Sequence, residues 1–135
     1  MELTERLAAA LAEILPVQRE DDGALTVPHD ETFASLRVVT IAEGLEMVSL
    51  TQVLAWDLPL DAKIRARVAK HAHDTLLGTV SMVEKIGVAG PGPRKTGDVL
   101  LRYNFPAAGL TDDALRTLVL MVLATGADVR RALVA

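Results

Sequence analysis

A chain of 135 residues and 14.4 kDa has room for one hydrophobic core, so we expect a single domain spanning residues 1–135. Hydrophobic residues make up 50% of the chain and charged residues 24%, which is typical of folded domains and excludes an intrinsically disordered chain. The absence of cysteine excludes disulfides, thiol catalysis and thiolate metal sites. A net charge of −4 and an aromatic content of only 3% argue against a surface that binds nucleic acid.

The charges are distributed unevenly along the chain. Residues 1–31 contain eight acidic and two basic side chains, whereas residues 61–97 contain seven basic and three acidic ones. These segments could attract each other within the fold or between subunits, or they could be ordinary solvated helix faces. The longest apolar run, 118–124, is far shorter than the roughly 20 residues that span a bilayer. Because the N-terminus is also acidic where a secretory signal is basic, we expect a cytoplasmic protein that does not contact membranes.

The first expected element is an amphipathic helix over residues 2–15, ended by Pro16. The polar, acidic stretch 18–23 predicts a loop, and residues 24–28 predict a short strand. Four apolar side chains of the helix recur on one face: Leu3, Leu7, Leu11 and Ile14.

Residues 33–41 and 45–56 are rich in β-branched side chains and predict a β-hairpin around Ala42-Glu43-Gly44. If Ile41 lies opposite Leu45, the alternation of side chains sets both faces of the hairpin. One face is almost wholly apolar, and we expect it to face the core. Its residues are Leu36, Val38, Val48, Leu50, Leu54 and Trp56.

The other face of this hairpin has a polar middle between apolar ends, whereas a simple solvated face would be more uniformly polar. Such a face could bind the apolar side chains of a partner, or it could merely lie beneath a loop or a neighbouring molecule. The candidate partner-binding residues are Phe33, Arg37, Val39, Ile41, Met47 and Val53.

Residues 57–60 are expected to break the strand, and Asp61 is the predicted N-cap of a second helix that ends near Gly78. A strand over 79–86, a flexible connection over 87–97 and a strand over 98–105 follow. The predicted buried stripe of the second helix is Ile64, Val68, His71 or Ala72, and Thr75 or Leu76.

A final helix begins near Thr111 or Asp112 and should loosen or bend at Gly126. Its block 118–123 leaves no polar face for nearly two turns, so it needs cover on more than one side. This helix or the second one could form a dimer interface. The resulting order is α-β-β-β-α-β-β-α, an α+β fold in which an antiparallel sheet carries segregated helices.

Patterns that carry chemistry elsewhere are incomplete in this chain. The stretch 90–97 is rich in glycine, but Arg94 stands where a phosphate-binding loop has glycine, and a strand follows it. His71 and His73 would point about 200° apart on a helix and cannot share one metal ion. We therefore expect no enzymatic activity, no metal and no cofactor. No nucleophile elbow surrounds the strand serines Ser35, Ser49 and Ser81.

Four segments carry a likeness to a known family. They are the helix-to-strand passage DTLLGTV at 74–80, the strand DVLLRYNFP at 98–106, the turn GLTDDAL at 109–115, and the helix end RRAL at 130–133. In these segments and in its order of elements, the chain resembles the type III secretion chaperone-like superfamily, which includes the CesT-type and YbjN-type proteins. The resemblance covers nearly the whole chain, although the glycine- and proline-rich stretch at 87–97 departs from the shortest members.

The resemblance implies an acidic cytoplasmic protein, often a homodimer, that binds an extended client or effector segment of another polypeptide without catalysis. A small-molecule-binding or regulatory domain, with a pocket between sheet and helices, is the alternative. A groove for a polypeptide needs exposed apolar ends, whereas a pocket needs enclosed polar anchors. A hydrolase would require serine, histidine and an acid to converge, and the sequence scatters them.

Overall fold

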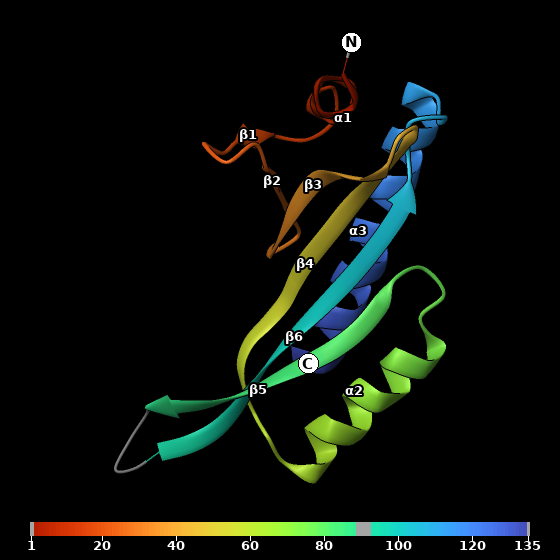
Figure 1. The fold of residues 1–135 in the computed structure, drawn as a ribbon. Helices are drawn as coiled ribbons and strands as arrows, with labels where there is room; N and C mark the ends of the chain where they lie inside the picture. The colour runs from red at the N-terminus through yellow and green to blue at the C-terminus, as the bar shows by residue number, and fades with distance from the viewer. Residues whose placement is uncertain (1, 89–92, 135) are drawn as a thin grey trace.

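The computed structural model describes residues 2–88 and 93–134. Within them, three helices accompany a six-stranded antiparallel sheet in the order β1-β2-β3-β4-β6-β5 (Figure 1). The predicted α+β class is confirmed, with one short additional strand in the part of the chain expected to be a loop. The elements are α1 (Leu3–Ala12), β1 (Gln18–Arg19), β2 (Leu25–His29), β3 (Thr32–Ala42), β4 (Leu45–Pro59), α2 (Ala62–Asp74), β5 (Thr79–Val88), β6 (Pro93–Pro106) and α3 (Asp112–Val134).

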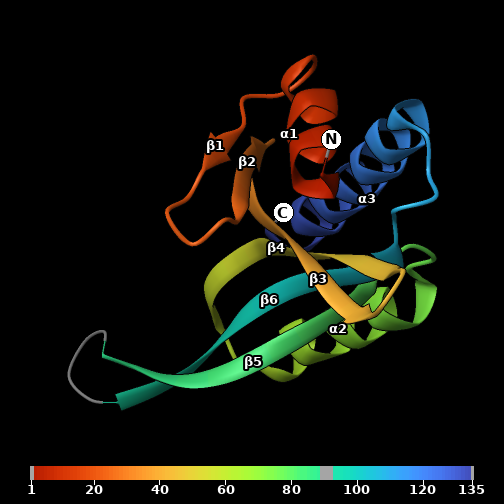
Figure 2. The same ribbon diagram turned by 45° about the horizontal axis from the view of Figure 1, so that its top comes forward.

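The helices bury their apolar sides against one face of the sheet. Figure 1 shows α3 running behind β4 and β6, and Figure 2 shows α1 beside α3 and α2 along β5. Alternate side chains of β2, β3, β4 and β6 point into the layer between sheet and helices, as the period of two in a strand requires. The most deeply buried of these are Val27, Leu36, Val48, Leu50, Leu54, Val99 and Leu101.

The predicted register of the β3–β4 hairpin is confirmed over most of its length. Leu36 lies opposite Leu50 and Val38 opposite Val48, on the face that packs against the helices. The register shifts near the turn, where Ala42 rather than Ile41 lies opposite Leu45. Ile41 is therefore an extra residue in β3, which increases the local bend and leaves its side chain 62% exposed.

The prediction that Trp56 belongs to the core is wrong. β4 does not stop at residue 57; it continues to Pro59 through two irregularities in its pairing with β6, one on each side of Ala55. Leu54 and Ala55 are both buried, so the strict alternation that placed Trp56 inside fails by one residue. Asp57 takes a positive φ of 54° at the second irregularity, and Trp56 is 61% exposed.

The first and second helices are shorter than the sequence predicts. α1 ends at Ala12, and the chain turns away through hydrogen bonds from the Ile14 and Leu15 amides to the Leu11 carbonyl, so Ile14 is exposed instead of buried. The predicted N-cap of α2 is confirmed, since Asp61 accepts a hydrogen bond of 2.8 Å from the Ile64 amide.

The end of α2 and the β5–β6 hairpin differ from the prediction in two ways. Ile64 and Val68 are buried as expected, but α2 ends at Asp74, so Leu76 lies beyond the helix and is almost fully exposed. Much of the flexible connection expected over 87–97 is strand, because β5 runs to Val88 and β6 begins at Pro93. The rest of that predicted connection, 89–92, lies outside the described residues.

α3 is one continuous helix that runs through Gly126 without a break. Thr111 caps it by accepting a hydrogen bond from the Ala114 amide. Its apolar block is packed from within the chain against α1, the sheet and α2, except at Met121, which is 52% exposed. Gly126 serves close packing instead: a Cβ atom there would lie 2.0 Å from Oε1 of Gln52, a fully buried side chain on β4.

Candidate partner-binding face of the sheet

The sheet face turned away from the helices, which we call the outer face, is open to solvent, and the β1–β2 loop reaches it at Arg37 through Asp22. Its side chains alternate with those of the core along β3, β4, β6 and β5, and each of them is at least partly exposed. The cross-strand registers arrange these side chains into rows, two of them apolar and two polar.

The first apolar cluster, the Phe33 patch, consists of Phe33, Val53, Trp56, Val83 and Leu100. Phe33 on β3 lies opposite Val53 on β4, which in turn lies opposite Leu100 on β6. On β5 the residue opposite Leu100 is Ser81, and Val83 lies two residues further along the same face, opposite Asp98. The indole of Trp56 lies 5.5 Å from the ammonium group of Lys85, which is two residues beyond Val83 on that face. Phe33 is 59% exposed, so this patch presents two aromatic rings to solvent.

The second apolar cluster, the Met47 patch, lies at the turn end of the hairpin. Val39 on β3 is opposite Met47 on β4, and Met47 is opposite Pro106 on β6. Ile41 and Leu45 flank the turn and are exposed. The patch is therefore built from β3, β4 and β6 and is open to solvent.

Polar side chains separate the two patches and include two arginines. Arg37 lies opposite Ser49 and forms an ion pair with Asp22, whose pKa is lowered because its carboxylate accepts a hydrogen bond from that guanidinium. Arg102 lies opposite Thr51, is exposed, and has no ion-pair partner among residues 2–88 and 93–134.

The six residues predicted to bind a partner all lie on this face or at its end, but they do not form one cluster. Phe33 and Val53 belong to the Phe33 patch, the Met47 patch contains the pair Val39 and Met47, and Ile41 and Arg37 lie beside or between them. Four residues of this face were not predicted: the irregularities around Ala55 turn Trp56 outward, and the place of the other three depends on β6 pairing between β4 and β5, an order that the alternation within strands does not reveal. These four are Trp56, Val83, Leu100 and Arg102.

Comparisons of the chain with protein-family models, curated proteins and solved structures found no match. Within the described residues, no helix is long and apolar enough to cross a membrane. The same residues bring no three histidine or acidic side chains together in a way that could hold a metal ion. The candidate site therefore rests on the geometry of the outer face.

A charged cluster borders the Phe33 patch where β4 bends. The ammonium group of Lys85 lies 2.7 Å from Oδ1 of Asp57 and 2.9 Å from Oδ1 of Asp98, and the Asp57 amide donates to Asp98. The hydrogen bond from Lys85 lowers the pKa of Asp57, and the two carboxylates, Asp57 first, raise the pKa of Lys85. The cluster joins the bend in β4 to the β5–β6 hairpin and holds Lys85 beside the Trp56 ring.

We expect the Lys85→Met variant to lose a stabilising contribution that depends on pH. The Asp57 contribution is present above the unfolded pKa of about 4 and disappears as pH falls through its lower folded value. The Lys85 contribution is present below an unfolded pKa of about 10.4 and disappears as pH rises through its higher folded value. The difference in Tm between wild type and Lys85→Met should therefore be largest near neutral pH and shrink at both extremes in thermal scans. Lys70→Met, on the exposed side of α2, should give a flat difference; parallel curves for both variants would contradict the prediction.

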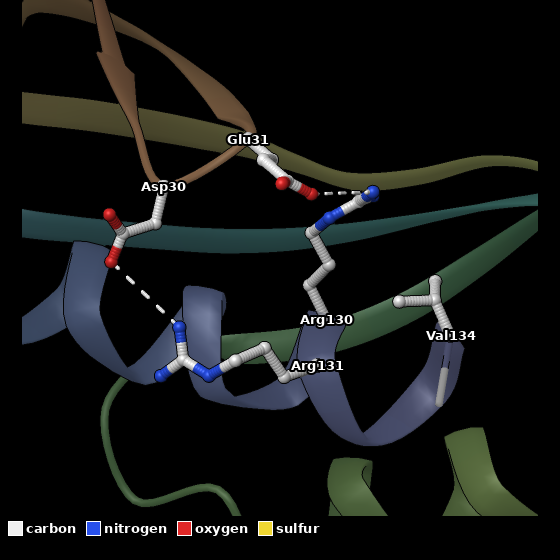
Figure 3. A pocket seen from close by; sticks show the side chains of 5 residues that line it. All are labelled: Asp30, Glu31, Arg130, Arg131 and Val134. Atoms are coloured by element: carbon white, nitrogen blue, oxygen red, sulfur yellow. Dashed lines mark hydrogen bonds and ion pairs between the residues drawn. The ribbon is translucent and has the colours of Figure 1, made fainter.

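A surface hollow beside the β2–β3 turn is a weaker candidate site (Figure 3). Asp30 and Glu31 both take positive φ values in this two-residue turn, and Figure 3 shows their carboxylates turned toward two arginines of α3. Arg130 pairs with Glu31 and donates to the Leu54 carbonyl at 2.7 Å, while Arg131 pairs with Asp30. Because both arginines are paired with carboxylates of the chain itself, we interpret these ion pairs as contacts that attach the β2–β3 turn to α3.

Proposed function

We propose that this protein is a non-enzymatic, chaperone-like module that holds an extended segment of another polypeptide, the client, against the outer face. The observation that carries this proposal is an uncovered sheet face with two apolar patches separated by a polar band. Contiguous exposed apolar surface of this kind is typical of sites that bind other proteins. The resemblance of the sequence to type III secretion chaperone-like proteins supports the same function.

The distance between the patches favours a polypeptide as the ligand. Phe33 and Val39 are six residues apart on β3, which corresponds to roughly 20 Å at 3.3 Å per residue. An extended client needs about the same number of residues to place one apolar side chain on each patch. A single small molecule of ordinary size would contact only one of them.

A ligand pocket between sheet and helices, the alternative function, is favoured by no observation in the described part of the chain. The polar groups enclosed there are Gln52 and Thr32, and the Gln52 amide donates to Thr32 Oγ1 at 2.8 Å and to the Leu123 carbonyl at 3.1 Å. The surrounding space is filled by buried aliphatic side chains. Gln52 Oε1 accepts no hydrogen bond from the described residues, but it lies so close to Gly126 of α3 that even a Cβ atom there would be 2.0 Å from it. No space for a ligand therefore remains beside this oxygen, whereas a binding pocket presents its anchors to a ligand.

We further propose that the protein acts as a homodimer joined at β5. β5 is an edge strand: in the described sheet it pairs with β6 on one side and has no strand on the other. Its side chains Val83 and Ile86 are exposed. Two-fold pairing of two β5 strands would give the exposed edge of β5 in each chain a hydrogen-bonding partner. Size-exclusion chromatography with light scattering should then give twice the 14.4 kDa chain mass at micromolar concentration. A strict monomer would contradict this part of the proposal and leave the client-binding face to be tested separately.

The client-binding proposal predicts that Val39→Asp combined with Met47→Asp abolishes capture of a polypeptide without unfolding the protein. The probe is a permanently unfolded model protein with reduced and alkylated cysteines, and binding is measured by titration calorimetry. Both side chains lie on the open face, but the two new carboxylates would lie opposite each other on β3 and β4, so we expect the free energy of unfolding to fall by about 1–2 kcal/mol.

The matched control is Met121→Asp combined with Val134→Asp. These are the same residue types on α3, at 52% and 48% exposure, away from the outer face. The control should bind the probe as wild type does. If both double variants bind the probe equally well while remaining folded, the outer face is not the binding surface.

A further inference from the structure

We propose that the client carries an acidic side chain between its two apolar anchors and that Arg102 binds this carboxylate. This inference rests on the proposed function, because it specifies the chemistry of the segment held on the outer face. It follows from the position of one unpaired guanidinium between the Phe33 patch and the Met47 patch.

Arg102 differs from the other charged groups of this face in having no countercharge. Arg37 is paired with Asp22, and Lys85 is held by Asp57 and Asp98. Arg102 lies near the middle of β6, opposite Thr51 on β4 and Thr79 on β5, and no carboxylate of the described residues reaches it. The band between the patches therefore presents a positive charge surrounded by hydroxyl groups.

A client that runs along β6 from Leu100 of the Phe33 patch to Pro106 of the Met47 patch covers this charge. Covering a guanidinium removes water from it, and an uncompensated buried charge costs far more than an exposed one. A carboxylate matches the fork geometry of arginine and forms a bidentate, charge-assisted pair with it. An acidic side chain in the client relieves the cost of covering Arg102, whereas a basic side chain adds repulsion.

The register also gives the position of the acid relative to the anchors. On β6, Arg102 is two residues from Leu100 of the Phe33 patch and four residues from Pro106 of the Met47 patch. These separations correspond to roughly 7 Å and 13 Å along the strand. The client pattern is therefore two apolar residues six positions apart, with the acid two positions from the residue that occupies the Phe33 patch.

The test uses synthetic peptides with two leucines six positions apart, serines and threonines elsewhere, and a glutamate two positions from one leucine. Trp56 is the only tryptophan of the chain and lies in the Phe33 patch, so its fluorescence reports binding directly. Replacing the peptide glutamate by lysine should weaken binding to the wild type roughly tenfold to a hundredfold. Arg102→Gln should remove this preference, and Arg102→Glu should reverse it in favour of the lysine peptide. Lys70→Gln on α2 is the matched charge control and should behave as wild type.

The outcomes separate this inference from the proposed function. If glutamate and lysine peptides bind equally while Val39→Asp with Met47→Asp abolishes binding, the face binds polypeptides and the acidic specificity is wrong. If the preference for the glutamate peptide persists in Arg102→Gln, another group of the protein binds the glutamate carboxylate and the inference is wrong. If peptides with serine in place of both leucines bind as well as the parent, or no peptide binds, the proposed function fails as well. If Val39→Asp with Met47→Asp dissociates a dimer, the occupant of the face is a second copy of the chain, which overturns the inference.

Discussion

Replacing Gly126 by alanine is expected to destabilise the protein by about 3 kcal/mol, despite the better helix propensity of alanine. The new methyl group would lie 2.0 Å from Oε1 of Gln52, which has no room to move within the layer between α3 and the sheet. Displacing the Gln52 amide breaks its hydrogen bonds to Thr32 and to the Leu123 carbonyl, and each buried group left unpaired costs about 1–3 kcal/mol. The measurement is the free energy of unfolding in urea.

A double-mutant cycle with Gln52→Ala identifies the cause. In the Gln52→Ala background the methyl group has space, so Gly126→Ala should cost close to nothing there, and the two substitutions should couple strongly. Gly109→Ala is the control, since nothing lies within 4 Å of a Cβ at that position and it should change stability by less than about 0.5 kcal/mol. Equal costs of Gly126→Ala with and without Gln52 would show that the helix packs differently from the structure described here.

The central hairpin could be predicted from the sequence because its determinants are local. Alternation of apolar and polar residues in 33–41 and 45–53 assigned most side chains to the correct face, and the turn contains Gly44, whose positive φ suits glycine. The N-cap Asp61 was predictable for the same reason, and Thr111 was one of two candidates for the cap of α3, because a cap acts within three residues of its own position.

The errors occur where distant parts of the chain set the local conformation. The irregularities around Ala55 move Trp56 outward, and they coincide with a contact between Asp57 and the β5–β6 hairpin 41 residues away. Gln52 is a polar residue in an otherwise apolar alternation, and Gly126 is a glycine inside a helix. The close contact between them explains why each residue type stands at its position. Neither pairing leaves a signal in a single sequence.

The candidate site was predicted in part for a similar reason. The hairpin supplied Phe33, Val39, Met47 and Val53 without knowledge of the rest of the sheet. Leu100 and Arg102 lie in the strand expected over 98–105, but their place beside the hairpin depends on β6 lying between β4 and β5. The strand order therefore places the Phe33 patch and the Met47 patch on one sheet face, with the charge of Arg102 between them.

The adjacent leucines of β6 provide a direct test of which sheet face is open. Leu101 is fully buried between the sheet and the helices, so Leu101→Ala should cost about 3 kcal/mol through lost burial and the cavity that remains. Leu100 lies on the outer face opposite Val53, and Leu100→Ala should cost less than about 1 kcal/mol. Both variants make the same chemical change at neighbouring positions, so the difference between their free energies of unfolding reports burial alone. Equal losses would mean that the outer face is covered in solution, and the client-binding surface would then have to lie elsewhere.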